Sequence, residues 1–192
     1  MCPRTKEQNE EIREQTRKQI MDAAFDLFAN EGYSRTSIAA VAQKANVSKG
    51  LIYHYFSGKQ EILEAIFDQL VALGDSMANF PDSFSPHDKI RQIIVQTFDF
   101  IKHQSGIGKL MVGLALQKEA FKALKPKLDY IQKEQMNMFS EIMAGLGHQQ
   151  PMLQAYQLGA TLDGILLAYV SLGNDYPLEE MKQKIISEYL DS

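Results

Sequence analysis

Apolar residues recur every three or four positions along most of the chain, which is the spacing of a helix that buries one face. In the first half, Ile20, Ala24, Leu27 and Phe28 share one face of a helix expected over about residues 10–30. Alternating apolar and polar patterns are absent, and prolines stand mostly between the periodic segments. The pattern predicts an all-α protein of about nine helices.

Two short helices are predicted after the first long one. Thr36 can cap the first of them and Ser48 the second, because both hydroxyl residues directly precede a short apolar period. Asn46, which tolerates the left-handed conformation, lies between them. Two short helices joined by such a turn are typical of a helix-turn-helix. A further helix is expected to start after Ser57 and to end at Gly74.

The rest of the chain repeats the helical period. Ser85 followed by Pro86 is a strong helix start, because serine caps the first amides and proline suits the first helical position. Pro151 and Pro177 are expected to open the last two helices in the same way. Pro126 interrupts or starts the long helix between them.

Charge is distributed unevenly. The net charge is −4, yet residues 32–60 contain no Asp or Glu and carry four basic side chains: Arg35, Lys44, Lys49 and Lys59. A positive patch on an acidic protein is typical of a phosphate binder, although a chance gap in acidic residues would look the same.

Composition narrows the remaining function classes. The one cysteine, Cys2, excludes a disulfide framework, and no apolar run is long enough to span a bilayer. The charged N-terminus is unlike a secretion signal, so we expect a cytoplasmic protein. None of the four histidines has a partner at a catalytic or metal-binding spacing. We therefore expect no enzyme activity, no cofactor and no metal.

The segment from residue 48 to 56 has two distinct faces when placed on a helix. Ile52, Tyr55 and Phe56 form the apolar face. The opposite face is unsuited to burial but suited to a phosphate backbone. Its members are Lys49, Gly50, Tyr53, His54 and Ser57.

Residues 14–65 resemble the N-terminal region of the TetR/AcrR-type bacterial transcriptional regulators. The matching positions are Gly32, Tyr33, Thr36, Ser37, Ile38, Val41, Ala42, Ala45, Val47, Ser48, Gly50, Ile52, Tyr53, Tyr55, Phe56, Lys59 and Leu63. The resemblance implies a helix-turn-helix DNA-binding domain over residues 10–60, and a ligand-binding and dimerisation domain over residues 61–192.

The same resemblance implies a set of DNA contacts: Thr36, Ser48, Lys49, Gly50, Leu51, Tyr53, His54, Tyr55 and Lys59. Tyr55 could equally belong to the core, and Leu51 could be a plain exposed residue unless it meets a thymine methyl. The outward face holds no Arg, Asn or Gln. We therefore expect specificity from a few base contacts together with DNA shape.

The family places a dimer interface on the last two helices, for which the candidates are Tyr156, Gly159, Ala160, Gly164, Leu167, Ile185, Ile186 and Tyr189. It also places an apolar ligand cavity among the central helices. The candidates for the cavity are Phe67, Phe98, His103, Met111, Leu114, Phe121, Tyr130, Phe139, Met143 and Asp163. For both the dimer and the cavity candidates, the alternative is that these side chains simply pack in the core of a single chain.

We therefore expect a bacterial regulator that binds a palindromic double-stranded DNA operator as a homodimer and is released by a small apolar or amphipathic molecule. Repression is the expected direction. An activator, a chromosome-organising protein or a ligand-binding module without DNA affinity remain alternatives. Neither the operator, the regulated genes nor the effector follows from the residues.

Overall fold

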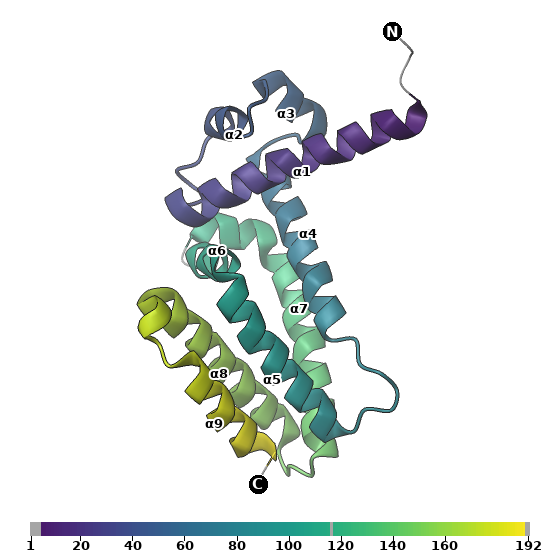
Figure 1. Cartoon of the computed structure of the whole chain (residues 1–192), viewed down its shortest axis with the longest axis vertical. Coiled ribbons are helices and arrows are strands. Elements are labelled where there is room, and N and C mark those ends of the chain that lie inside the picture. The colour runs from purple at the N-terminus through teal and green to yellow at the C-terminus, as the bar shows by residue number, and fades with distance from the viewer. Residues whose placement is uncertain (1–4, 116, 191–192) are drawn as a thin grey trace. The chain divides into compact units, whose positions relative to one another are not determined.

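The computed structural model describes residues 5–115 and 117–190. Side chains at 73, 76, 77, 105, 115, 118–121 and 123 lie outside that description. Within these limits the protein is all-α, as predicted, with nine α-helices, one 3₁₀ turn and no strand. The helices (Figure 1) are α1 (Lys6–Glu31), α2 (Ile38–Lys44), α3 (Lys49–Tyr55), α4 (Lys59–Met77), α5 (Pro86–His103), α6 (Ser105–Ala115), α7 (Lys118–Gly145), α8 (Pro151–Leu172) and α9 (Leu178–Leu190).

The chain forms two compact units. The first consists of Met1–Leu70 together with Gly113–Ala123, and the second of Val71–Val112 together with Leu124–Ser192. Helices α4, α6 and α7 therefore each contribute residues to both units. Among the described residues, no helix is both long enough and apolar enough to cross a bilayer.

The turns of the first unit follow from local chemistry. Helix α1 ends where Gly32 takes a φ of 91°, a conformation that glycine adopts without strain. Helix α2 ends at Lys44, and Asn46, two residues later, takes a φ of 51°. There the amide of Val47 donates to the carbonyl of Ala42 at 3.0 Å, and that of Asn46 to Gln43 at 3.1 Å. This pair of bonds is the Schellman arrangement, and it turns the chain directly into α3.

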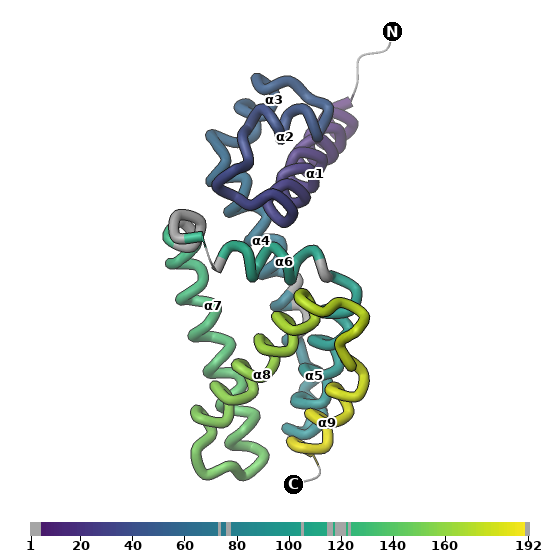
Figure 2. Tube along the Cα trace, turned by 90° about the vertical axis from the view of Figure 1, so that its left-hand side faces the viewer, coloured from purple at the N-terminus to yellow at the C-terminus, as the bar shows by residue number. Residues whose placement is uncertain are grey.

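The core of the first unit is formed where α1, α2 and α3 meet the start of α4. Helix α2 packs against both α1 and α3, and the two short helices lie side by side along α1 (Figures 1 and 2). Each element contributes a fully buried side chain, such as Ile20, Val41, Ile52 and Ile62, all 0% exposed. The short helices, too short to be stable alone, are held by this packing.

The second unit is a helical bundle in which α5 packs against α8 and α9; the three lie side by side in Figures 1 and 2. Helix α5 begins as predicted, with a capping box between Ser85 and Asp88 and with Pro86 in its first turn. The core of the second unit contains side chains from α5, α7, α8 and α9: Ile90, Ile93, Ile94, Phe98, Ile101, Met136, Phe139, Ile142, Met143, Ala155, Leu158, Leu162, Ile165, Ile185 and Tyr189.

Two of the predicted helix boundaries were wrong. Helix α4 continues through Gly74 to Met77, because a single glycine costs a helix only about 1 kcal/mol. Helix α7 continues through Pro126, which lies in its third turn and neither interrupts nor starts it. The openings of α8 at Pro151 and of α9 directly after Pro177 are confirmed.

Candidate nucleic-acid interface

The candidate interface is built on α3, whose position is fixed by its cap and its buried face. The Ser48 hydroxyl accepts a hydrogen bond from the amide of Leu51 at 3.1 Å, as expected for an N-cap. Ile52 is 0% exposed and Phe56, directly after the helix, is 1% exposed. With these two side chains in the core, the opposite face of this short helix must point to solvent.

That outward face carries the side chains that the sequence assigned to it. Tyr53 is 57% exposed and Leu51 is 37% exposed, and Lys49, Gly50 and His54 are exposed as well. A Cβ placed on Gly50 would have the Ser48 hydroxyl, 3.9 Å away, as its nearest neighbour. The backbone is therefore open to close approach by a partner molecule.

Tyr55 lies between the two faces of α3. It is half-buried, and its ring meets that of His54 edge-on at 5.2 Å between centroids. Both expected roles, in the core and at the groove wall, are therefore compatible with its position. The ring contact orients His54, which remains exposed.

Thr36 does not lie on the surface, contrary to the expectation that it contacts phosphate. It is 3% exposed, and its hydroxyl donates to the carbonyl of Gly32 at 2.9 Å. Ser37 caps α2 instead, accepting from the amide of Ala40 at 3.1 Å. In this position the Thr36 hydroxyl is engaged within the first unit. The cap of α2 was therefore predicted one residue too early, at Thr36.

The four basic residues of segment 32–60 have different surroundings. Lys44 pairs with Asp26 at 2.7 Å, and the Arg35 Nε donates to the carbonyl of Glu31 at 2.6 Å. The Lys59 ammonium is bound to backbone carbonyls of the α1–α2 loop. Lys49 is exposed at the start of α3. Three of the four positive charges are therefore engaged within the first unit, so the positive patch is smaller than the sequence suggested. Lys49 contributes its charge to the surface of α3.

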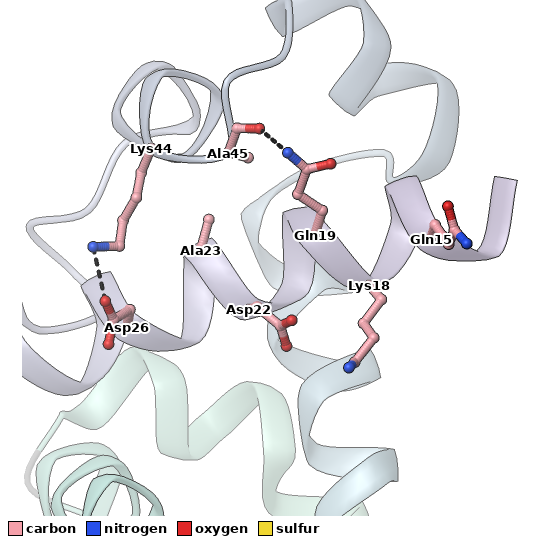
Figure 3. Close-up of a pocket in the computed structure, with 8 residues that line it drawn as sticks. All are labelled: Gln15, Lys18, Gln19, Asp22, Ala23, Asp26, Lys44 and Ala45. Carbon is pink, nitrogen blue, oxygen red and sulfur yellow. Dashed lines mark hydrogen bonds and ion pairs between the residues drawn. The ribbon is translucent and has the colours of Figure 1, made fainter. Parts of the chain in front are cut away.

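An open groove of about 430 Å³ is lined by residues of α1 and of the end of α2 (Figure 3). Two interactions lie within this lining: Lys44 pairs with Asp26, and the Gln19 amide donates to the carbonyl of Ala45 at 2.7 Å. We assign no ligand to this groove because it is open to solvent and four of its eight lining residues already pair with one another.

The predicted ligand-binding residues fall into different environments. Phe98, Phe139 and Met143 are at most 2% exposed in the packed core of the second unit. Phe67 and Leu114 are buried in the first unit, and Met111 is half-buried. Tyr130 is 67% exposed, and His103 and Asp163 are exposed too. The Phe121 side chain lies outside the described residues. No pocket described in the structure is lined by any member of this set.

Helix α8 carries most of the predicted dimer face. Tyr156 is 53% and Leu167 is 50% exposed; Ala160 and Gly164 are exposed, and Gly159 is half-buried. Asp163 lies on the same face, and desolvation by neighbouring atoms raises the pKa of its carboxyl.

The predicted contributions of α9 require a correction. Ile185 is 3% and Tyr189 is 7% exposed, because both pack into the core of their own unit. Ile186 is half-buried and also packs against this core. An interface through α9 would therefore involve its other positions, whereas α8 offers exposed apolar side chains directly.

One interaction in the first unit was missed altogether by sequence reasoning. The Gln117 side-chain oxygen accepts from the amide of Ser34 at 2.9 Å and from its hydroxyl at 3.2 Å. The Gln117 nitrogen donates to the carbonyl of Gly113 at 3.0 Å. The two bonds to Ser34 join residues 83 positions apart, and no local pattern could have indicated them.

Comparison with known proteins supports the helix-turn-helix assignment. Residues 20–66 match the model of the family described as bacterial regulatory proteins, tetR family. The chain is 35% identical over 102 residues to the HTH-type transcriptional regulator TtgR of Pseudomonas putida. That match covers 52% of this chain and spans about half, 47%, of TtgR. The regulator BetI of Burkholderia thailandensis is 26% identical over 94% of both chains.

Solved structures show that the likeness in fold extends beyond this segment. FadR from Bacillus subtilis, solved in complex with stearoyl-CoA, superposes with a TM-score of 0.73 at 19% identity, covering 90% of this chain and 97% of that one. SmeT, solved in complex with triclosan, gives a TM-score of 0.74 at 18% identity, covering 91% and 90%.

Proposed function

Because this chain belongs to the TetR family of bacterial transcriptional regulators, we propose that it represses transcription as a homodimer on a palindromic DNA operator, and that a small apolar or amphipathic molecule releases it. The relatives it matches are named as regulators rather than as enzymes.

The observation that carries this proposal is the division of α3 into a buried and an outward face. Ile52 is 0% exposed while its neighbour Tyr53 is 57% exposed. The exposed tyrosine lies on one surface with Lys49, Gly50 and His54, in a segment without a single acidic residue. In a helix-turn-helix, the second helix enters the major groove. In this chain α3 would present hydrogen-bond donors on stiff side chains, together with the positive charge of the exposed Lys49, to that groove.

We propose a homodimer because the outward face of a single α3 is small. One seven-residue helix offers too few contacts for a specific operator. Two copies separated by one helical turn of DNA, about 34–36 Å, or by a multiple of it would double them. The exposed apolar positions of α8, including Tyr156 and Leu167, are spaced to form one stripe along the helix. Exposed glycine and alanine between them permit close approach of a second helix.

The effector class is inferred from the neighbours and from the composition of the second unit. FadR was solved with stearoyl-CoA, an amphipathic molecule with a long acyl chain, and SmeT with triclosan, a small apolar molecule. The candidate lining here is likewise aromatic and rich in methionine, which adapts to apolar ligands of varied shape. Phe98, Phe139 and Met143 are fully packed. An effector must therefore separate these side chains, and so selects a different packing of the core.

Release of DNA then requires only modest coupling. A coupling free energy of about 1–3 kcal/mol between effector and operator changes the operator affinity about 5- to 150-fold. Linkage demands the reciprocal effect, so that operator DNA must weaken effector binding by the same factor. An effector that binds with equal affinity to the free protein and to the DNA complex would contradict this mechanism.

The direct test is binding to DNA that flanks the gene for this protein, measured at several salt concentrations. Specific binding through phosphate contacts weakens steeply with salt because counterions are released on association. An activator or a chromosome-organising protein would bind DNA with a similar salt dependence. Mapping occupancy across the genome separates these functions, since a local repressor occupies one or a few promoters and transcription rises when its gene is deleted.

A further inference from the structure

Lys59, the first residue of α4, reaches back across the first unit to the loop between α1 and α2. Its Nζ lies 2.7 Å from the carbonyl oxygen of Tyr33, 2.9 Å from that of Thr36 and 3.4 Å from that of Ser34. The same ammonium lies 4.4 Å from the centre of the Tyr33 ring. These contacts link residues 23 to 26 positions apart in the sequence.

The three carbonyls match the hydrogen-bonding capacity of the ammonium. A lysine ammonium has three N–H donors and no acceptor, so three carbonyl acceptors occupy all of them. Two of the carbonyls belong to buried residues, because Tyr33 is 7% and Thr36 is 3% exposed. The Tyr33 carbonyl also accepts from the amide of Thr36 at 3.3 Å. Removing the ammonium would therefore take the stronger donor from the Tyr33 carbonyl and the Lys59 donor from the Thr36 carbonyl, which is costly in a core.

The loop that Lys59 holds also determines where α2 begins. Thr36 directly precedes Ser37, the cap of α2, and α2 in turn packs against α3. The Phe28 ring packs edge-on against Tyr33 at 5.1 Å between centroids, which fixes the aromatic ring beneath the ammonium. The lysine thus completes a rigid junction between the end of α1, the start of α2 and the start of α4.

We propose that Lys59 is a positioning residue that sets the placement of the helix-turn-helix, rather than a ligand for a DNA phosphate. This inference rests on the proposed DNA-binding function for its consequence in binding, and on the contacts above for its structural part. To reach a phosphate, the ammonium would have to leave carbonyls of buried residues. Lys49 bears the same charge and lies exposed at the start of α3, where a phosphate contact has no such cost.

Lys59→Met and Lys49→Met form a matched pair, since each removes one positive charge and keeps an apolar stem. The probe is a DNA duplex selected by the wild-type protein from a random pool. Each phosphate contact contributes about 0.9 to the slope of log affinity against log salt, so loss of one contact per protomer reduces the slope of a dimer by about 1.8. We expect this reduction for K49M, with an unchanged unfolding midpoint.

For K59M we expect a different signature: an unchanged slope, a lower unfolding midpoint, and an affinity reduced by the same factor at every salt concentration. The affinity is measured at a temperature where circular dichroism shows the variant to be folded. A K59M protein with normal unfolding and a slope reduced by about 1.8 would overturn the proposal.

A second variant covers the case in which K59M does not fold. Lys59→Arg keeps the charge, but its planar guanidinium cannot direct its donors at three converging carbonyls. A positioning role predicts a lowered unfolding midpoint for K59R, whereas a phosphate ligand would tolerate arginine with normal unfolding and normal affinity. The unfolding measurements need no DNA. If the wild-type protein showed no salt-dependent binding, the proposed function would fail while the role of Lys59 in the junction was still decided.

Discussion

Ile52 and Tyr53 are adjacent in α3 but are expected to respond in opposite ways to replacement by alanine. Ile52 is 0% exposed, so Ile52→Ala removes buried methyl groups and leaves a cavity. Such changes cost about 2–5 kcal/mol of folding free energy. Tyr53 is 57% exposed, and a surface substitution of this kind stays within about 0.5 kcal/mol.

The effects on DNA binding should be reversed. A hydrogen bond to a charged group contributes about 1.5–3 kcal/mol, and a dimer loses two of them when Tyr53 is replaced. The loss of about 3 kcal/mol or more corresponds to an affinity about 100-fold lower, since 1.4 kcal/mol is a factor of ten. Tyr53→Phe, which keeps the ring and removes the hydroxyl, should account for most of that loss.

Two measurements decide the outcome: chemical denaturation for stability and titration of a fluorescent duplex for affinity. The temperature of the titration is chosen so that the Ile52→Ala protein is folded. The Tyr53→Ala protein should be as stable as wild type and should bind DNA weakly. If Tyr53→Ala bound as tightly as wild type, the outward face of α3 would not be the surface that contacts DNA.

Three further predictions follow from other parts of the protein. Leu167→Glu, which places a charge on the exposed face of α8, should shift sedimentation from dimer to monomer; an unchanged dimer would exclude this face. Gly145→Ala should destabilise by about 1–3 kcal/mol, because its Cβ would lie 2.6 Å from the stiff Pro86 ring. Gly74→Ala, with nothing within 4 Å, should instead stabilise by about 0.5–1 kcal/mol, and equal effects at both glycines would refute the packing argument. The hydroxyl and amide of Ser85 lower the pKa of Asp88 below its ordinary 3.8. Its contribution to stability is therefore present above pH 3.8 and lost as the pH falls through the lowered value. Asp88→Asn should flatten that part of the acid unfolding curve, and an unchanged curve would show that the cap is not coupled to folding.

Local signals in the sequence predicted local structure well. The pair Ser85 and Pro86, the left-handed Asn46 and the prolines at 151 and 177 each act on their own turn of backbone, and all appear where expected. The division of α3 into two faces was predictable for the same reason, since helical spacing fixes which side chains share a side.

Features that depend on distant partners were not predictable. The choice between Thr36 and Ser37 as the cap depends on the Thr36 hydroxyl bonding to Gly32, which only the folded chain brings about. A run of basic residues does not show which of the positive charges has a partner in the folded chain. Lys59 is bound by carbonyls 23 or more positions away, and only the fold brings them to it. Spacing places Phe98 on an apolar face but does not show what covers that face.

The central claim is that α3 enters the major groove twice per operator, and hydroxyl-radical footprinting on a selected duplex tests it most directly. We predict two protected segments, related by a two-fold axis, with centres about 34–36 Å or a multiple of one helical turn apart. Both should vanish with Tyr53→Ala and persist with an exposed substitution elsewhere. A single unpaired segment, or two that Tyr53→Ala leaves intact, would contradict the account.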